Sequence, residues 1–352
     1  MIDQAQSIIS YSWTPQLDGD DLDQILALVT AASAYDDEAG FAQIDPADVT
    51  STDVTGDIRV LHLPIRAHPD LNPADLNPAD LSPDEYAPPV VVAYLRLAIG
   101  AGGLATVSYV VHPDYRSRGL TTLLVEQLGL DAATEGGWDG TGATALRCWA
   151  YSTHPAAERL TRRFGVDAVA EQWGLARPLT GPFALPLDVP EVPAGLVLGA
   201  PRALGADVAE LVEVLGAASV PQAHRDRLTS DLSRGTGTVI EARDATGVML
   251  GFVWYTTATT IHLELRAAPV FALILAASAT GQGLGSALLV AAMTDQRDKP
   301  PAGERGAQVS LLRINPDDHA AVRMCRLLGY EQEDSDTCYQ VGRTDEPPPV
   351  FG

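Results

Sequence analysis

Apolar residues recur along the chain with two different periods. Leu22, Ile25 and Val29 fall on one face of a helix that we expect over residues 21–34, behind an acidic first turn. Shorter apolar runs bounded by turn residues follow, and such runs are typical of strands. We expect these strands at residues 58–63, 89–97, 104–111 and 143–150, with a further helix at 119–131.

The second half of the chain repeats this order of elements. We expect strands near residues 237–243, 248–255, 268–276 and 307–314, and helices after Gly205, Gln222, Gly283 and Asp317. Residues 177–196 are rich in proline and predict a linker between the halves. Residues 70–88 repeat Leu-Asn-Pro-Ala-Asp and predict a surface loop, and residues 342–352 predict a disordered tail.

Two motifs occur twice at a constant separation of 164 residues. A loop that leads into a helix places Gly119 in the first copy and Gly283 in the second. An Ala-Ala helix that ends in glycine follows each loop, and it places Gly165 opposite Gly329 in the same frame. Two motifs in one frame predict a duplicated domain. We therefore expect an N-terminal domain at 1–176 and a C-terminal domain at 197–341.

The repeated loop has the character of an anion site. An apolar strand, a loop of small residues and a helix would direct several backbone amides and the positive end of the helix dipole at one point. The loop is not a P-loop, because no Gly-Lys-Ser/Thr follows and Lys299 is the chain's single lysine. Each copy of the loop therefore predicts a cradle for a phosphate group.

The first loop, Arg-Ser-Arg-Gly-Leu-Thr at 116–121, resembles the Gln/Arg-x-x-Gly-x-Gly/Ala loop of the GNAT family of N-acetyltransferases. The later helices resemble that family's Asn-x-Ala-Ala segment. Because both motifs occur twice, about residues 20–341 resemble the mycothiol synthase family of tandem GNAT enzymes. The resemblance implies an α/β (α+β) fold of two tandem GNAT domains, each a mixed, mostly antiparallel sheet flanked by helices.

The resemblance also implies acetyl-CoA as co-substrate. In the N-terminal domain a strand edge would lie beside the pantetheine and the loop around the pyrophosphate, with two arginines as added cations. These residues are Tyr109, Val110, Val111, Arg116, Ser117, Arg118, Gly119, Leu120, Thr121 and Thr122. In the C-terminal domain they are Leu273, Ile274, Leu275, Thr280, Gly281, Gln282, Gly283, Leu284, Gly285 and Ser286, with Asp318 as the N-cap of the later helix.

Other family residues are replaced in the C-terminal domain, where the family carries out transfer. The tyrosine acid falls on Cys325, which could act as an acid or as a buried structural cysteine. The glutamate falls on Pro269, and Glu264 is the nearest carboxylate if a gap shifts the register, or else an outward-facing strand residue. Substrate contacts fall on Gln43, Gln222 and Thr256, and each replacement removes a charge. A lost charged hydrogen bond costs about 1.5–3 kcal/mol.

Composition restricts the partners. Acidic residues outnumber basic ones by 46 to 23, and the net charge of −23 disfavours nucleic acid and anionic membranes. The sequence shows no secretory signal and no apolar run that could span a bilayer. Three separated cysteines and isolated histidines predict neither a disulfide framework nor a metal site. We expect a cytoplasmic monomer whose partner is a small-molecule amine.

Three functions stay open at this point. The first is acetylation of the cysteinyl amine of cysteinyl-glucosaminyl-inositol, which the resemblance implies. The second is a diverged acetyltransferase that acts on another amine through the N-terminal domain, whose loop keeps both arginines. The third is a pseudoenzyme that binds coenzyme A without catalysis, because the catalytic residues of the family are replaced.

Overall fold

The computed structural model of the protein describes residues 9–36, 44, 46–50, 58–68, 88–188, 190–205, 208–220, 222–346 and 348. The chain packs into two units. Unit 1 comprises Met1–Val169 and Thr337–Asp345, and unit 2 comprises Ala170–Asp336 and Glu346–Gly352. Nearly all of the expected loop at 70–88 and part of the expected tail at 342–352 lie outside the described residues.

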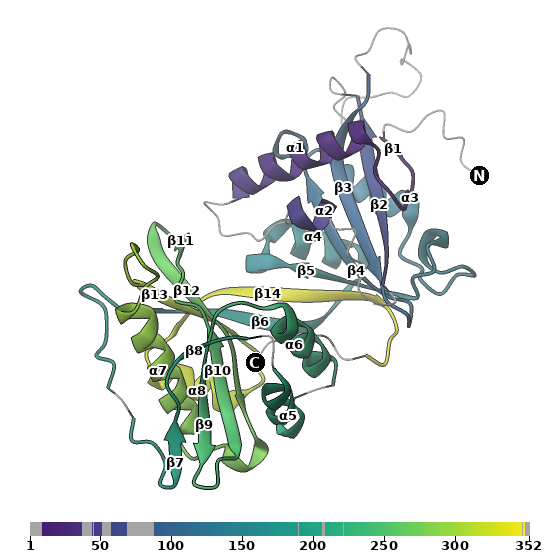
Figure 1. Ribbon diagram of the computed structural model, residues 1–352. Helices are drawn as coiled ribbons and strands as arrows, with labels where there is room; N and C mark the ends of the chain where they lie inside the picture. Colours follow the sequence, from purple (N-terminus) through teal and green to yellow (C-terminus); the bar gives the residue numbers. More distant parts are fainter. Residues whose placement is uncertain are drawn as a thin grey trace. The chain divides into compact units, whose positions relative to one another are not determined.

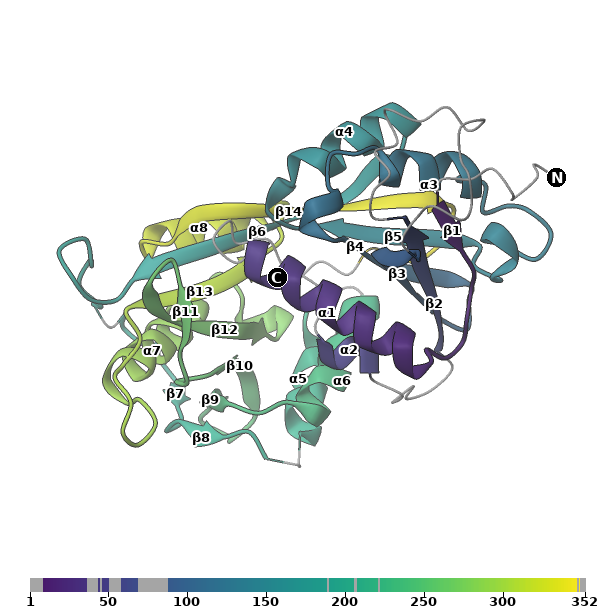
Figure 2. The same cartoon turned by 90° about the horizontal axis from the view of Figure 1, so that it is seen from above.

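Unit 1 is a mixed sheet with helices on both faces (Figures 1 and 2). Its strands run in the order β1 (Ile9–Tyr11), β2 (Arg59–Ala67), β3 (Val90–Ile99), β4 (Leu104–Val111), β5 (Ala145–Ala150) and the end of β14 (Glu331–Gly342). Neighbouring strands are antiparallel except β4 and β5, which are parallel. Figure 2 shows α1 (Gly19–Asp36) and α2 (Pro46–Thr50) on one face, and α3 (Leu120–Leu128) and α4 (Pro155–Phe164) on the other.

Successive side chains along the strands of unit 1 alternate between the two faces of the sheet and form an apolar layer on each. Tyr94 and Val110 face α1 and pack with Ile25. The adjacent Leu95 packs on the opposite face, in the cluster that includes Leu124 of α3. Because successive side chains of a strand point to opposite faces, a nearly continuous apolar run such as β3 can bury both faces of one sheet.

Unit 2 has the same plan. Its strands run in the order β6 (Asp167–Pro178), β13 (Val309–Ile314), β12 (Leu265–Leu275), β10 (Met249–Tyr255), β9 (Thr238–Asp244) and β7 (Leu196–Leu198), with β11 (Thr260–His262) beside β12 and β8 (Arg202–Ala203) beside β9. Its helices are α5 (Ala209–Ala217), α6 (Gln222–Arg234), α7 (Leu284–Asp298) and α8 (His319–Leu327). Val253 and Tyr255 pack against α7, whereas Phe252 and Trp254 pack against α5 and α6. Figure 1 shows α7 on one side of β9 and β10, and α5 and α6 on the other.

The two halves of the chain exchange their last strands. Residues 337–342 of β14 pair with β5 and complete the sheet of unit 1, while residues 173–178 of β6 pair with β13 in unit 2. Thr337 lies opposite Ala150, and Trp173 lies opposite Ile314, so the two registers correspond under the 164-residue repeat. The predicted domain limits, 1–176 and 197–341, follow the linear repeat and do not include this exchange.

The helices and strands expected from the sequence are present, with ends that shift by a few residues. The structure adds β6 and β14, two strands that follow the Ala-Ala helices and that the apolar pattern does not predict. Structural elements also obey the repeat, since β5 and β13 begin 164 residues apart, at Ala145 and Val309. None of the helices in the described part of the chain is both long and apolar enough to cross a membrane.

Candidate functional site

The loop between β12 and α7 in unit 2 forms an open cradle of backbone amides. After the single turn η7 (Ala277–Ala279), Gly281 and Gly283 adopt φ angles of 74° and 90°. The six amides of residues 281–286 donate to no other group in the described part of the chain. A Cβ added at Gly281 or Gly283 would meet no atom within 4 Å, so the outer side is open. Free amides at a helix N-terminus favour an anion.

Side chains stiffen this loop without adding charge. The hydroxyl of Thr280 donates to the carbonyl of Ala277 at 2.8 Å, and the side-chain amide of Gln282 donates to the carbonyl of Ser278 at 2.9 Å. Both bonds close onto the turn that precedes the glycines. The anion-binding capacity of unit 2 therefore rests on backbone amides and the helix dipole.

Unit 1 repeats the cradle. The turn η4 (Pro113–Tyr115) precedes Ser117 and Gly119, whose φ angles are 61° and 79°. Ser117 is a non-glycine residue in the left-handed region, a conformation that its glycine counterpart in unit 2 adopts without strain. The amides of residues 117–122 also donate to no other described group.

The two arginines of this loop have different surroundings. Arg116 binds both carboxylate oxygens of Asp36 on α1, at 2.5 and 2.8 Å, and its Nε donates to the carbonyl of Val111. Asp36 is buried, so the two charges neutralise each other inside unit 1. Arg118 stacks on the ring of Tyr115 at 5.0 Å. Of the two expected cations, only Arg118 is without a carboxylate partner in the described part of the chain.

Each cradle lies beyond a point where two parallel strands separate. In unit 2, β12 pairs with β13 from Ala267 to Val270 and then continues to Leu275 paired only with β10. A bulge at Phe271 marks the separation, because Trp254 and Tyr255 of β10 pair with Ala272 and Val270. The expected edge residues Leu273, Ile274 and Leu275 lie on the separated segment. Their strand presents unpaired backbone groups toward the opening.

The separation in unit 1 differs in two respects. β4 pairs with β5 only as far as Val107, but its register with β3 is regular and has no bulge. Tyr109, on the separated segment, shares a hydrogen bond of 3.1 Å with Thr121 of α3, and burial raises the pKa of its phenol to about 12. Val110 is buried against α1. In unit 1 a side-chain hydrogen bond therefore joins the strand edge to the helix. The corresponding residues of unit 2 are Leu273 and Gly285, whose side chains cannot form such a bond.

Comparison with known proteins identifies the family. The chain is 30% identical over 251 residues to the mycothiol acetyltransferase of Saccharopolyspora erythraea, a match that covers 68% of this chain and 77% of that protein. The chain belongs to the mycothiol acetyltransferase family. The mycothiol acetyltransferase of Nocardia farcinica is 29% identical over 349 residues, which cover 94% of this chain and 97% of that protein. A scan against models of protein families found no match.

Solved structures show the same fold. A tandem GNAT protein from the clavulanic acid biosynthesis pathway superposes with a TM-score of 0.64 at 19% identity, over 96% of this chain and 100% of that protein. This likeness concerns the fold alone. The expected fold, two tandem GNAT domains with mixed, mostly antiparallel sheets, is confirmed for this member of the mycothiol acetyltransferase family.

The position of Cys325 favours a packing role. Its side chain on α8 is fully buried in the core cluster of unit 2, and burial raises the pKa of its thiol to about 12. A thiol of such high pKa is a weak acid at neutral pH, so its protonated form is stable but transfers its proton poorly. Of the two roles that the sequence allows for Cys325, the structure favours that of a buried structural cysteine.

The position of Glu264 separates it from the cradle. Leu263 and Glu264 have φ angles of 46° and 65° and form the exposed turn between β11 and β12. The cradle begins at the other end of β12, after Leu275. At about 3.3 Å per residue, that strand spans about 33 Å, so Glu264 is not part of the cradle.

The remaining expected residues of this mycothiol acetyltransferase family member are only partly described. Thr256 follows β10, and its amide donates to the carbonyl of Pro269 at 3.2 Å. Gln222 begins α6, but its side chain lies outside the described parts, and Gln43 lies outside the described residues altogether. Asp318 is confirmed as the N-cap of α8, since its carboxylate accepts from the amides of Ala320 and Ala321.

A group of charged residues that the sequence reasoning missed lies beside the opening in unit 2. Arg313 is the first residue of β13 beyond the part that pairs with β12. Its guanidinium binds Asp336, and its Nη2 lies 3.7 Å from Oδ2 of Asp334. Oδ1 of Asp334 is buried and has no hydrogen-bond partner among the described residues. Asp334 lies against Gly174, where any Cβ would collide with the carboxylate. Asp334 lies 21 positions from Arg313 and 160 from Gly174, so no local motif indicates the group.

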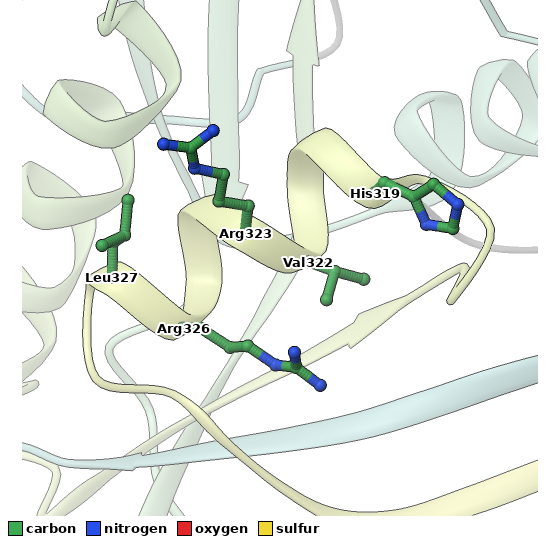
Figure 3. Close-up of a pocket in the computed structure, with 5 residues that line it drawn as sticks. All are labelled: His319, Val322, Arg323, Arg326 and Leu327. Carbon is green, nitrogen blue, oxygen red and sulfur yellow. The ribbon is translucent and has the colours of Figure 1, made fainter.

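A cavity on the described residues lies elsewhere. It is a shallow depression of about 380 Å³ on α8, lined by His319, Val322, Arg323, Arg326 and Leu327 (Figure 3). Figure 3 shows Val322 and Arg326 pointing to one side of the helix, with Arg323 and Leu327 pointing to the other. The depression contains neither cradle, so we do not assign it to the acetyltransferase site.

Proposed function

We propose that this protein is an acetyl-CoA-dependent N-acetyltransferase that acetylates the cysteinyl amine of cysteinyl-glucosaminyl-inositol to give mycothiol, and that transfer takes place in unit 2. The family relationship supports the proposed reaction. The separated strands and the bulge at Phe271 carry the proposal for unit 2, because unit 1 lacks the bulge and closes the corresponding space with the Tyr109–Thr121 bond.

The residues of unit 2 fit the coenzyme. The free amides of residues 281–286 suit a pyrophosphate, and the open side beyond Gly281 and Gly283 leaves room for it. Residues 271–275 no longer pair with β13, so their backbone groups on that side can bond the two amides of the pantetheine arm. Acetyl-CoA supplies the activated acetyl thioester, and the chain contributes position and orientation.

Asp334 is our candidate for the group that receives the substrate amine. An ammonium group must lose a proton before it attacks, and a carboxylate can hold the cation and accept that proton. Asp334 has a buried oxygen free of hydrogen bonds and lies on the sheet next to the strand opening. Arg313 and Asp336 fix its surroundings. This assignment replaces the missing family glutamate by a carboxylate from a different strand.

The reaction can be tested directly with purified protein, acetyl-CoA and cysteinyl-glucosaminyl-inositol. We expect an N-acetylated product by mass spectrometry. Gly283→Glu places a negative side chain in the cradle of unit 2 and should raise the KM for acetyl-CoA by about tenfold or more, because it repels the phosphates and forces a non-glycine residue to a φ of 90°. Gly119→Glu, the matched change in unit 1, should leave turnover close to normal.

Asp334→Asn tests the amine site. We expect kcat/KM to fall by about 10²–10⁴, the usual contribution of a general base, and the pH dependence of the rate to change. Glu333→Gln is the matched control, since Glu333 pairs with His262 at the surface. Turnover that survives Gly283→Glu but disappears with Gly119→Glu would place the reaction in unit 1. Binding of acetyl-CoA without turnover on this amine would contradict the proposed reaction.

A further inference from the structure

A row of polar side chains crosses the sheet of unit 1 on the face that carries α1. His62 of β2 lies opposite Arg96 of β3, and Arg96 lies opposite Ser108 of β4. Residues opposite one another in adjacent strands project to the same face. The neighbouring Tyr94 joins the row, because its hydroxyl lies 2.6 Å from Nδ1 of His62. The four side chains form one group, which we name the Arg96 cluster.

Arg96 carries an unpaired positive charge. Its Nε is buried without a hydrogen-bond partner, and among the described residues it forms no salt bridge. Leaving a buried donor unpaired costs about 1–3 kcal/mol. His62 cannot neutralise this charge, because its ring carries no negative charge in either form. Burial, and after it the nearby Arg96, lowers the pKa of His62 from its ordinary value. Folding alone gives no reason for an unpaired arginine here.

The second copy of the fold shows what a purely structural row looks like. The corresponding row in unit 2 consists of Val239, Trp254 and Ala272. Val239 lies opposite Trp254, and Trp254 lies opposite Ala272. All three are buried in the apolar cluster beneath α5 and α6. Unit 1 thus replaces an apolar row by His, Arg and Ser while keeping the strand pairing. The fold tolerates an apolar row at these positions, so the polar side chains need another explanation.

The position of the row points to a ligand. Ser108 is the first residue of β4 beyond the part that pairs with β5, so the cluster lies where the two strands separate. Arg96 as a whole is half-buried, so the residue is not closed off from solvent. A guanidinium fork matches the two oxygens of a carboxylate, and hydroxyls of serine and tyrosine can complete its hydrogen bonds. One cation with neutral neighbours balances a single negative charge, whereas a phosphate carries nearly two.

We infer that the Arg96 cluster is a binding site for a small carboxylate-bearing molecule in unit 1, held by the guanidinium of Arg96 and the hydroxyl of Ser108. The site is separate from both amide cradles and from the charged group around Asp334. Its occupancy does not require acetyl transfer, so the inference stands whether or not the proposed reaction is correct. A carboxylate held here would place the rest of the molecule beside the strand opening of unit 1.

The Nε–H proton of Arg96 provides a direct test. We would record its nuclear magnetic resonance signal, assigned with Arg96→Lys, while titrating the whole protein with acetate, L-alanine or inorganic phosphate. Saturable shifts with acetate and L-alanine, and weaker ones with phosphate, are the expected result. No saturable shift with either carboxylate would overturn the inference, and tighter binding of phosphate would overturn the assignment to carboxylates.

Variants test the same point by affinity. Arg96→Gln should weaken the binding of acetate and of L-alanine at least about tenfold, because the substitution removes a charged hydrogen bond. The variant breaks no described interaction of Arg96, so the fold should survive. Arg162→Gln, on the exposed surface of α4, is the matched control and should bind as the wild type does. Unchanged acetyl-CoA binding in Arg96→Gln would separate this site from the cradles, and unchanged carboxylate binding in that variant would refute the assignment.

Discussion

Removal of the exchanged strand should strongly destabilise unit 1 while sparing unit 2. A chain that ends at Asp336 lacks the segment of β14 that pairs with β5, whereas a chain that ends at Arg343 retains it. The two chains differ by seven residues at one end. Because the lost segment belongs to the sheet of unit 1, a local change at the end of the sequence should act on strands near residue 150.

The magnitude follows from the ladder. Six residue pairs join the segment to β5, from Thr337 opposite Ala150 to Gly342 opposite Ala145. An antiparallel ladder averages about one hydrogen bond per pair, and each contributes about 1 kcal/mol net, so the ladder contributes about 6 kcal/mol. Cys338, which is fully buried, adds about 1 kcal/mol. Domains are stable by only about 5–15 kcal/mol, so unit 1 would become marginal.

Hydrogen exchange followed by mass spectrometry can locate the effect. In the chain that ends at Asp336, amides of β5 should exchange far faster than in the chain that ends at Arg343, while amides of β10 in unit 2 should exchange equally in both. Thermal unfolding of the shorter chain should show an early transition. Equal protection of β5 in the two chains would refute the strand exchange on which the reasoning depends.

Two further predictions concern charged groups of unit 1. Asp36→Asn leaves the partly buried Arg116 without its carboxylate partner. We expect the free energy of unfolding in urea to fall by about 2 kcal/mol, less than for a fully buried pair because Arg116 is 25% exposed. A fall below about 0.5 kcal/mol would contradict this. Burial and Arg96 lower the pKa of His62 in the folded state from its ordinary value of 6.5. At a pH below 6.5, His62 therefore takes up a proton when the protein unfolds. Stability should therefore fall as pH drops below that value, by at most about 1.4 kcal/mol per pH unit, and His62→Gln should lose this part of the pH dependence.

The sequence could predict most of the fold because the signals are local. The apolar period of residues 21–34 and the alternation of residues 104–111 indicate α1 and β4 without reference to distant residues. The cradles were predictable for the same reason, since Gly281 and Gly283 encode their own backbone conformation. The family resemblance added the reaction, but it transferred roles to Cys325 and Glu264, whose surroundings it could not reveal.

What the sequence determined by itself is therefore the duplication, the order of helices and strands, and the two loops of free amides, because each depends on residues close together in the chain. The tertiary structure decided which strand completes which sheet: β6 and β14 occupy equivalent places in the repeat, so either could pair with β5 or β13 by pattern alone. It also decided that Arg116 is neutralised by Asp36, 80 residues away, and that Asp334 lies against Gly174. Charge and burial at a site depend on side chains that only folding brings together, and for that reason two loops of similar sequence and backbone have different surroundings.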